Sequence, residues 1–131
     1  MVRFLTLLHM RSIFAEEGEY YVKIHDYKTA GGKNLILEYL KKLPAKERAE
    51  GYWIRQSINN EGFNALEFLK TRQLRGKLWE IKFTSNRIMY VVKDGDNIYF
   101  LHACKKQKGK AEKQDLETAI KRAKEYGLKI G

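Results

Sequence analysis

The sequence predicts an α+β fold in which helices pack against a small antiparallel sheet. Apolar residues recur at helical spacing over residues 35–60 and again near the C-terminus, whereas from Leu78 the apolar period changes from 3.6 to 2. The length of 131 residues, with a single proline, suits one domain with one core. We expect the order β-α-α-β-β-β-α, with the helices on one face of the sheet and the other face free.

The N-terminal half of this domain is expected to contain one strand and two helices. Residues 20–27 are aromatic and β-branched, and a pair of glycines follows them, which predicts a strand and its end. Residues 35–43 have the apolar spacing of an amphipathic helix. Pro44 ends that helix and can occupy the first turn of the next one, over residues 45–60. One stripe of this second helix carries Ala49, Tyr52, Trp53 and Gln56.

The C-terminal half is expected to form a three-stranded meander and a final helix. Residues 63–76 are mixed in character and predict a short helix followed by a loop. Alternating apolar residues predict strands, and the short polar connections between them predict tight turns. The predicted strands cover residues 78–84, 87–93 and 97–105, and the helix covers residues 112–126 and stops at Gly127.

Residues 1–19 are expected to be an N-terminal extension and residues 20–131 the folded domain. The apolar run of the extension is short, is interrupted by His9 and Arg11, and leads to no small-x-small cleavage site, which argues against a signal peptide. No apolar run reaches the roughly 20 residues that span a bilayer. The single cysteine, Cys104, excludes a scaffold stapled by internal disulfides. We therefore expect a cytoplasmic protein with no membrane partner.

The positive charge is concentrated in one half of the chain. The net charge is +10, and residues 70–131 hold 16 basic and 7 acidic side chains, against 10 and 9 in residues 1–69. A lysine run alone is often a solvated loop, but a bias of this size in so small a chain favours a polyanionic partner. Nucleic acid is the first candidate. The charge is densest at Lys105, Lys106, Lys108, Lys110 and Lys113.

The uncovered sheet face is predicted to carry a group of cations. Alternation along residues 78–84 assigns Glu80 and Lys82 to this face and the apolar residues between them to the core. If the meander pairs as expected, Lys82, Arg87 and Lys106 come from three adjacent strands. Three cations without matching carboxylates repel one another unless an anion is bound among them. The sequence therefore predicts an anion site here.

A cationic site of this kind suits phosphoryl chemistry. RNA cleaves itself when its 2′-hydroxyl is aligned with the adjacent phosphate, so a nuclease needs positioning, charge stabilisation and proton transfer. His102, Lys82 and Tyr126 are the candidates for proton transfer, although His102 and Tyr126 also suit packing roles. His102 and Cys104 could supply two zinc ligands, but the other histidines lack ligand spacing, so we expect no metal and no cofactor.

Several segments of the chain together resemble a known toxin superfamily. The resemblance covers residues 20–126 and is to the phage-derived HigB-like branch of the RelE/ParE toxins. The segments that carry it are Gly32-Lys33, Glu38-Tyr39-Leu40, residues 74–83 (LRGKLWEIKF), residues 87–90 (RIMY), residues 101–106 (LHACKK), and Ala119 with Arg122 and Tyr126.

The resemblance implies a RelE-like fold and a toxin of a type II toxin–antitoxin system. Such toxins cleave mRNA in the A site of the 70S ribosome without a metal, and are held inactive by a cognate antitoxin, in this branch usually a helix-turn-helix DNA-binding protein. By position, Lys82 corresponds to a general base or charge stabiliser and Arg87 to a phosphate-contacting arginine. Lys106 stands where RelE has a second arginine, and Tyr126 resembles a substrate-contacting tyrosine. Ala103-Cys104 replace the usual glycine and aromatic residue.

The predicted site therefore has a catalytic part and an RNA-binding part. The catalytic candidates are Lys82, Arg87, Lys106, His102 and Tyr126, and the RNA-binding candidates are Arg75, Lys77, Lys105, Lys108 and Lys110. Two other functions stay open on the same fold. One is a ParE-like gyrase inhibitor, and the other is a non-enzymatic phage accessory protein that binds RNA or a host protein.

Overall fold

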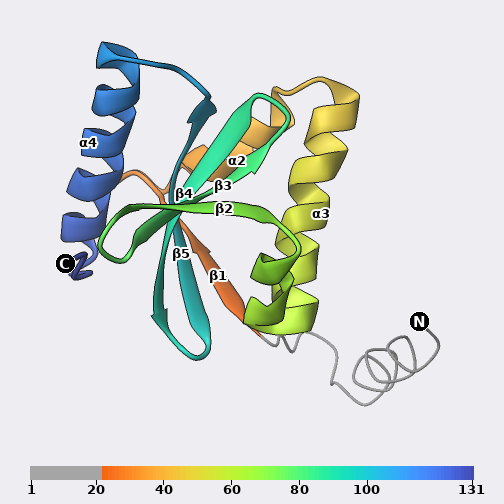
Figure 1. Ribbon diagram of the computed structural model, residues 1–131, viewed down its shortest axis with the longest axis horizontal. Coiled ribbons are helices and arrows are strands. Elements are labelled where there is room, and N and C mark those ends of the chain that lie inside the picture. Colours follow the sequence, from red (N-terminus) through yellow and green to blue (C-terminus); the bar gives the residue numbers. More distant parts are fainter. Residues whose placement is uncertain (1–21) are drawn as a thin grey trace.

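The computed structural model describes residues 22–131 and shows an α+β protein built on one five-stranded sheet (Figure 1). The strand order is β1-β5-β4-β3-β2, with β1 parallel to β5 and the other neighbours antiparallel. The α+β class and the meander of the last three strands are thereby confirmed. The elements are β1 (Lys23–Asp26), α2 (Leu35–Lys41), α3 (Ala45–Glu61), the 3-10 helix η1 (Gly62–Glu67), β2 (Lys70–Arg75), β3 (Leu78–Phe83), β4 (Asn86–Asp94), β5 (Asn97–Lys105) and α4 (Lys110–Glu125).

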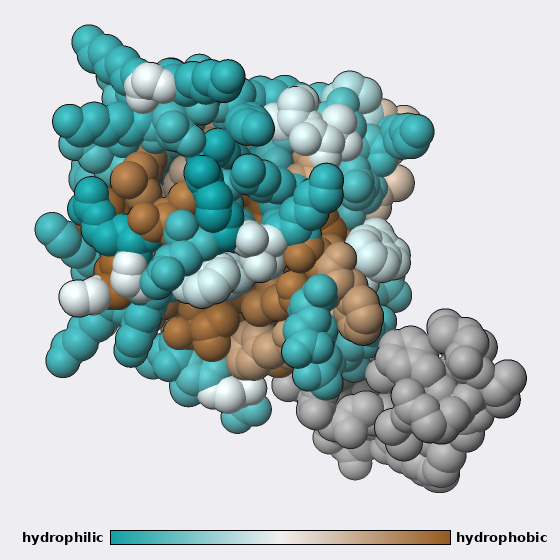
Figure 2. Space-filling model, in the orientation of Figure 1, coloured by the Kyte–Doolittle hydropathy of each residue, from teal (hydrophilic) through white to brown (hydrophobic). Residues whose placement is uncertain are grey.

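Helices lie on both faces of the sheet, which differs from the single covered face that we expected. α2 and α3 pack on one face, and α4 packs on the other, so the sheet lies between them in Figure 1. The sequence of α4 explains the difference, because its buried residues Ala119 and Ala123 are small and allow a close approach to the strands. Hydrophilic side chains predominate along the top of the molecule in Figure 2, and hydrophobic patches show between them at the left and lower down.

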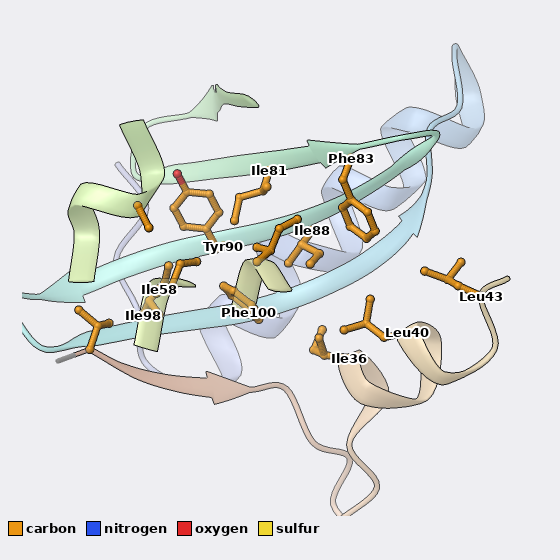
Figure 3. Packing of buried hydrophobic residues seen from close by; sticks show 13 residues of the cluster. Ile36, Leu40, Leu43, Ile58, Ile81, Phe83, Ile88, Tyr90, Ile98 and Phe100 are labelled. Carbon is orange, nitrogen blue, oxygen red and sulfur yellow. The ribbon is translucent and has the colours of Figure 1, made fainter. Parts of the chain in front are cut away.

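The larger core fills the space between the sheet and helices α2 and α3. Alternate strand residues point into it, among them Ile81, Ile88 and Phe100, and none of these three is exposed to solvent (Figure 3). Ile36 and Leu40 of α2 are also fully buried and lie among them. The alternation predicted for β3 is confirmed, because Trp79, Ile81 and Phe83 face this core while Glu80 and Lys82 project from the opposite face, which Leu78 shares.

A smaller core joins α4 to the opposite face. Met89, Val91 and Leu101 from the sheet pack with Ala119 and Ala123 of α4. This helix covers only part of the face, because its N-terminal turn carries charged residues rather than apolar ones. A polar region therefore remains beside the core, where β2, β3 and β4 pass under the start of α4.

The segment between α3 and β3 contains a strand that the sequence interpretation missed. Residues 63–76 were expected to be a short helix and a loop, and they form η1 followed by β2. β2 is an edge strand whose register with β3 shifts between Gln73 and Arg75, and four of its six residues are exposed. An exposed edge strand has little apolar alternation, so its period is hard to read from sequence.

Helix α3 buries a different stripe from the one that we expected. Its buried residues are Gly51, Ile54, Ser57 and Ile58. Tyr52 and Trp53 lie on the other side and are 37% and 56% exposed. The expected stripe was wrong because it was chosen by the two large aromatic residues, whereas the helix buries smaller side chains. A Cβ on Gly51 would lie 2.7 Å from Leu40, so α2 and α3 approach too closely there for a large side chain.

Two further expectations concern the N-terminal extension and membrane-spanning segments. The predicted extension, residues 1–19, lies outside the described residues, as do Tyr20 and Tyr21 of the first predicted strand. Within residues 22–131, no helix has both the length and the apolar character to cross a bilayer.

Candidate functional site

Three basic side chains gather on the sheet face under the start of α4. Lys82 of β3 lies opposite Arg87 of β4, and Arg72 of β2 lies opposite Glu80 of β3. Because side chains two residues apart on a strand share a face, the pairing brings Arg72, Lys82 and Arg87 around Glu80. The structure thus brings together two of the predicted catalytic residues and adds one that the sequence interpretation did not include.

The cations of this cluster are paired with carboxylates, contrary to our expectation. Glu80 has no exposed surface, and its carboxylate lies 3.0 Å from Arg72 Nε, 3.3 Å from Arg87 Nη1 and 3.8 Å from Lys82 Nζ. Glu112 of α4 lies 3.3 Å from Arg87 Nη2 and 3.5 Å from Arg72 Nη2. Glu80 was visible in the sequence between two core residues, but Glu112 arrives through the packing of α4, which no local pattern showed.

Arg87 lies at the bottom of this cluster. It is 1% exposed, and it borders a pocket of about 350 Å³ together with Arg72, Met89, Gly109, Glu112 and Lys113. The hydrogen bond from Arg87 holds the pKa of the Glu112 carboxyl below its ordinary value, so this group is an anion at neutral pH. The pocket therefore has a guanidinium floor with one carboxylate over it.

His102 is held by two partners on the same sheet face. Its Nε2 lies 2.8 Å from Asp115 Oδ1, and its Nδ1 lies 3.2 Å from Arg122 Nη1. An arginine only donates hydrogen bonds, so Nδ1 accepts and Nε2 carries the proton that is donated to Asp115. Burial lowers the pKa of His102 and keeps the ring neutral. Both ring nitrogens are thus engaged in fixing α4 to β5.

His102 also belongs to the one group of three potential metal ligands within residues 22–131. The ligand atoms of His102, Cys104 and Asp115 lie within 4.8 Å of one another. A metal on Nε2 would move the ring proton to Nδ1, where it would face the N–H of Arg122. Burial also raises the pKa of the Cys104 thiol to about 12, which disfavours the thiolate that a metal requires. This donor set suits a hydrogen-bond network better than a metal ion.

Tyr126 lies away from the cation cluster. It follows the last turn of α4, and about 21 Å of helix axis separates it from Glu112 at 1.5 Å per residue. Its ring packs at 5.6 Å from that of Tyr27 and 5.7 Å from that of Tyr99, and its hydroxyl accepts a hydrogen bond from the backbone of Lys28. Tyr126 is 38% exposed on a separate part of the surface.

The predicted RNA-binding residues divide between the two ends of the sheet. Lys105, which lies 3.4 Å from Glu47, ends β5 opposite the start of β4, and exposed Lys108 and Lys110 follow it toward α4. Exposed Lys106 also lies at this end, where its backbone N–H donates to Ser85. This end carries the cation cluster. The other two predicted residues, Arg75 and Lys77, are exposed at the β2–β3 turn at the opposite end of β3.

Two residues of the cluster could have been found from the sequence only with difficulty. Arg72 belongs to the missed strand β2, where Lys70, Arg72 and Leu74 alternate onto one face. Glu112 was placed in the final helix, but this helix was expected on the same sheet face as α2 and α3, and it lies on the opposite face. The one sequence signal for these two residues was charge. Residues 70–131 hold few carboxylates, so each of them is a candidate partner for the many cations of this segment.

Comparison with known proteins assigns the chain to a family. Residues 38–124 match the family described as phage-derived protein Gp49-like (DUF891), so this chain belongs to the Gp49-like family. This is a toxin-like family of the RelE/HigB type. The matched range contains the whole cation cluster, whereas β1 and Tyr126 lie outside it. A search of curated proteins finds no match.

Proposed function

We propose that this protein is the toxin of a type II toxin–antitoxin system and that it cleaves mRNA on the ribosome. The observation that carries the proposal is the cluster of Arg72, Lys82 and Arg87 on one sheet face. Exposed Lys70 lies opposite Lys82, and exposed Lys113 lines the pocket. Membership of a toxin-like family supports the proposal. We also propose a helix-turn-helix antitoxin as the partner that holds the protein inactive.

The proposed reaction is transesterification within the RNA. The 2′-oxygen forms a bond to the adjacent phosphorus, the bond from phosphorus to the 5′-oxygen breaks, one proton leaves the 2′-hydroxyl and one reaches the 5′-oxygen. The phosphate gains negative charge in the transition state, and guanidinium groups stabilise such charge effectively. Arg72 and Arg87 would hold the phosphate, and Lys82, 30% exposed beside them, would transfer a proton or stabilise the leaving oxygen.

His102 and Tyr126 have other roles in this proposal. Both nitrogens of His102 already take part in hydrogen bonds, so this residue positions α4 rather than transferring protons to RNA. Tyr126 lies at the far end of α4 and contacts Lys28, so it has no access to the same phosphate.

Induced expression in bacteria tests the proposal. Wild-type protein should stop the incorporation of methionine while thymidine incorporation continues, and primer extension should find new 5′ ends within translated messages. Lys82→Ala should abolish both effects. Lys93→Ala removes the same charge from an exposed position near the end of β4 and should behave as wild type. DNA damage with intact messages would instead support the gyrase alternative and overturn the nuclease proposal.

A further inference from the structure

The Glu112 carboxylate lies in the position that an oxyanion ligand of the cluster would take. One of its oxygens, Oε2, is within 3.5 Å of a terminal nitrogen of both Arg72 and Arg87. Two guanidinium groups that converge on a single oxygen form the arrangement by which proteins bind phosphate oxygens. In this structure the place of the phosphate oxygen is taken by the carboxylate of Glu112.

The cluster also has unused hydrogen-bonding capacity. Among the described residues, Arg87 Nε has no hydrogen-bond partner although the side chain is 1% exposed. The oxygens of buried Glu80 have close cations but accept no well-directed hydrogen bond within the same part of the chain. Buried polar atoms are usually satisfied, and those that are not often mark a place where a ligand completes the set. Arg87 borders the pocket of about 350 Å³, a volume typical of small-ligand sites.

Charge favours an exchange between Glu112 and a phosphodiester. With Glu80 fixed beneath them, Arg72, Lys82 and Arg87 keep an excess of positive charge that the single charge of Glu112 reduces. A phosphodiester also carries one negative charge, so it replaces the carboxylate without changing the balance. Glu112 is 39% exposed in the first turn of α4, which begins at Lys110, so the side chain can turn toward solvent without disturbing a core.

We propose that Arg72 and Arg87 form a phosphodiester subsite for single-stranded RNA that Glu112 fills in the absence of RNA, so that RNA binds by displacing this carboxylate. The inference rests on the proposed function for the identity of the ligand. It makes Glu112 an internal competitor that lowers the affinity for RNA.

The test measures binding rather than cleavage. The probe is a fluorescein-labelled oligouridylate with 2′-O-methyl groups, which cannot be cleaved because its nucleophile is blocked. Glu112→Gln should bind this probe about tenfold more tightly than wild type, the effect of removing one charge-assisted competitor. Glu117→Gln, on an exposed position of the same helix, changes the net charge equally and should stay within about twofold of wild type.

A double variant separates displacement from a general effect of charge. Adding Arg72→Gln to Glu112→Gln should remove the gain, because one of the two guanidinium groups is then missing. Equal affinities for Glu112→Gln and Glu117→Gln would overturn the inference, and so would a gain that persists in the double variant. If wild type cleaves messages but Glu112→Gln does not bind the probe more tightly, the toxin proposal stands and the displacement inference fails. If Glu112→Gln binds the probe more tightly but wild type cleaves no message, the displacement inference stands and the toxin proposal fails.

Discussion

Arg87 has a structural position in the fold and also borders the pocket of the proposed site. Its guanidinium is buried against Glu80, which has no exposed surface, and it also forms the floor of the pocket. Removing one partner of a buried ion pair leaves the other charge without compensation, which costs more than the pair contributes. A loss of activity on substitution of Arg87 would thus have two causes, whereas Lys82, 30% exposed, is the cleaner position for testing function.

The difference between Arg87 and Lys82 can be measured as stability. We expect Arg87→Gln to lower the free energy of unfolding by about 3 kcal/mol, because buried Glu80 loses its closest fully buried cation. Lys82→Ala should lower it by less than about 1 kcal/mol, as for other solvent-accessible pairs. Urea denaturation of both variants gives the comparison. Similar losses would mean that Arg87 and Glu80 do not form the pair that we describe.

The partly buried His102 is expected to make stability depend on pH. Its folded-state pKa is lowered, first by burial and then by Arg122, and the hydrogen bond to Asp115 opposes this only in part. The unfolded chain therefore binds a proton more readily near its ordinary pKa of about 6.5, and the stabilisation that is complete above this pH is lost as the pH falls below it. Urea denaturation at pH 7.5 and 5.5 should show a smaller loss for His102→Gln than for wild type. An equal loss in both proteins would contradict this assignment.

At the scale of elements, the regular ones were predictable and the exceptions share a physical cause. The meander from β3 to β5 was predicted from the alternation of apolar residues in the strands and from the short polar turns that connect them. β2 was missed because an edge strand needs no apolar face. Arg72 lies on this strand, so it was not predicted as a site residue either. The face chosen by α4 depends on small residues that bury little area but permit close packing. Periodicity alone does not carry that information.

The buried stripe of α3 is tested by a matched pair of substitutions. Ile54 is 1% exposed in the larger core, whereas its neighbour Trp53 is 56% exposed. We expect Ile54→Ala to lower the free energy of unfolding by about 2–5 kcal/mol through the lost burial and the cavity left behind. Trp53→Ala should change it by less than about 1 kcal/mol in urea denaturation. The opposite ranking would support the stripe that the sequence suggested and would contradict this packing.

At the scale of the whole molecule, charge and fold act together. Two helices cover one sheet face with the larger core, and α4 lies on the other face (Figure 1). The cation cluster lies beside the start of α4 on that second face. Residues 70–131 supply strands β2 to β5, three of which carry the cluster, and they also hold most of the excess positive charge. The bias in charge was visible in the sequence, but its focus under the start of α4 and its balance by Glu80 and Glu112 required the tertiary structure.

The most direct test of the central claim is the rate of message cleavage by purified protein on translating ribosomes. Single-turnover reactions would compare wild type with Lys82→Ala and with the control Lys93→Ala, and primer extension would locate the cut. We expect discrete cleavage within codons only when ribosomes carry the message, a rate at least about 100-fold lower for Lys82→Ala, and an unchanged rate for Lys93→Ala. Intact message with wild-type protein, or equal rates for wild type and Lys82→Ala, would contradict the account.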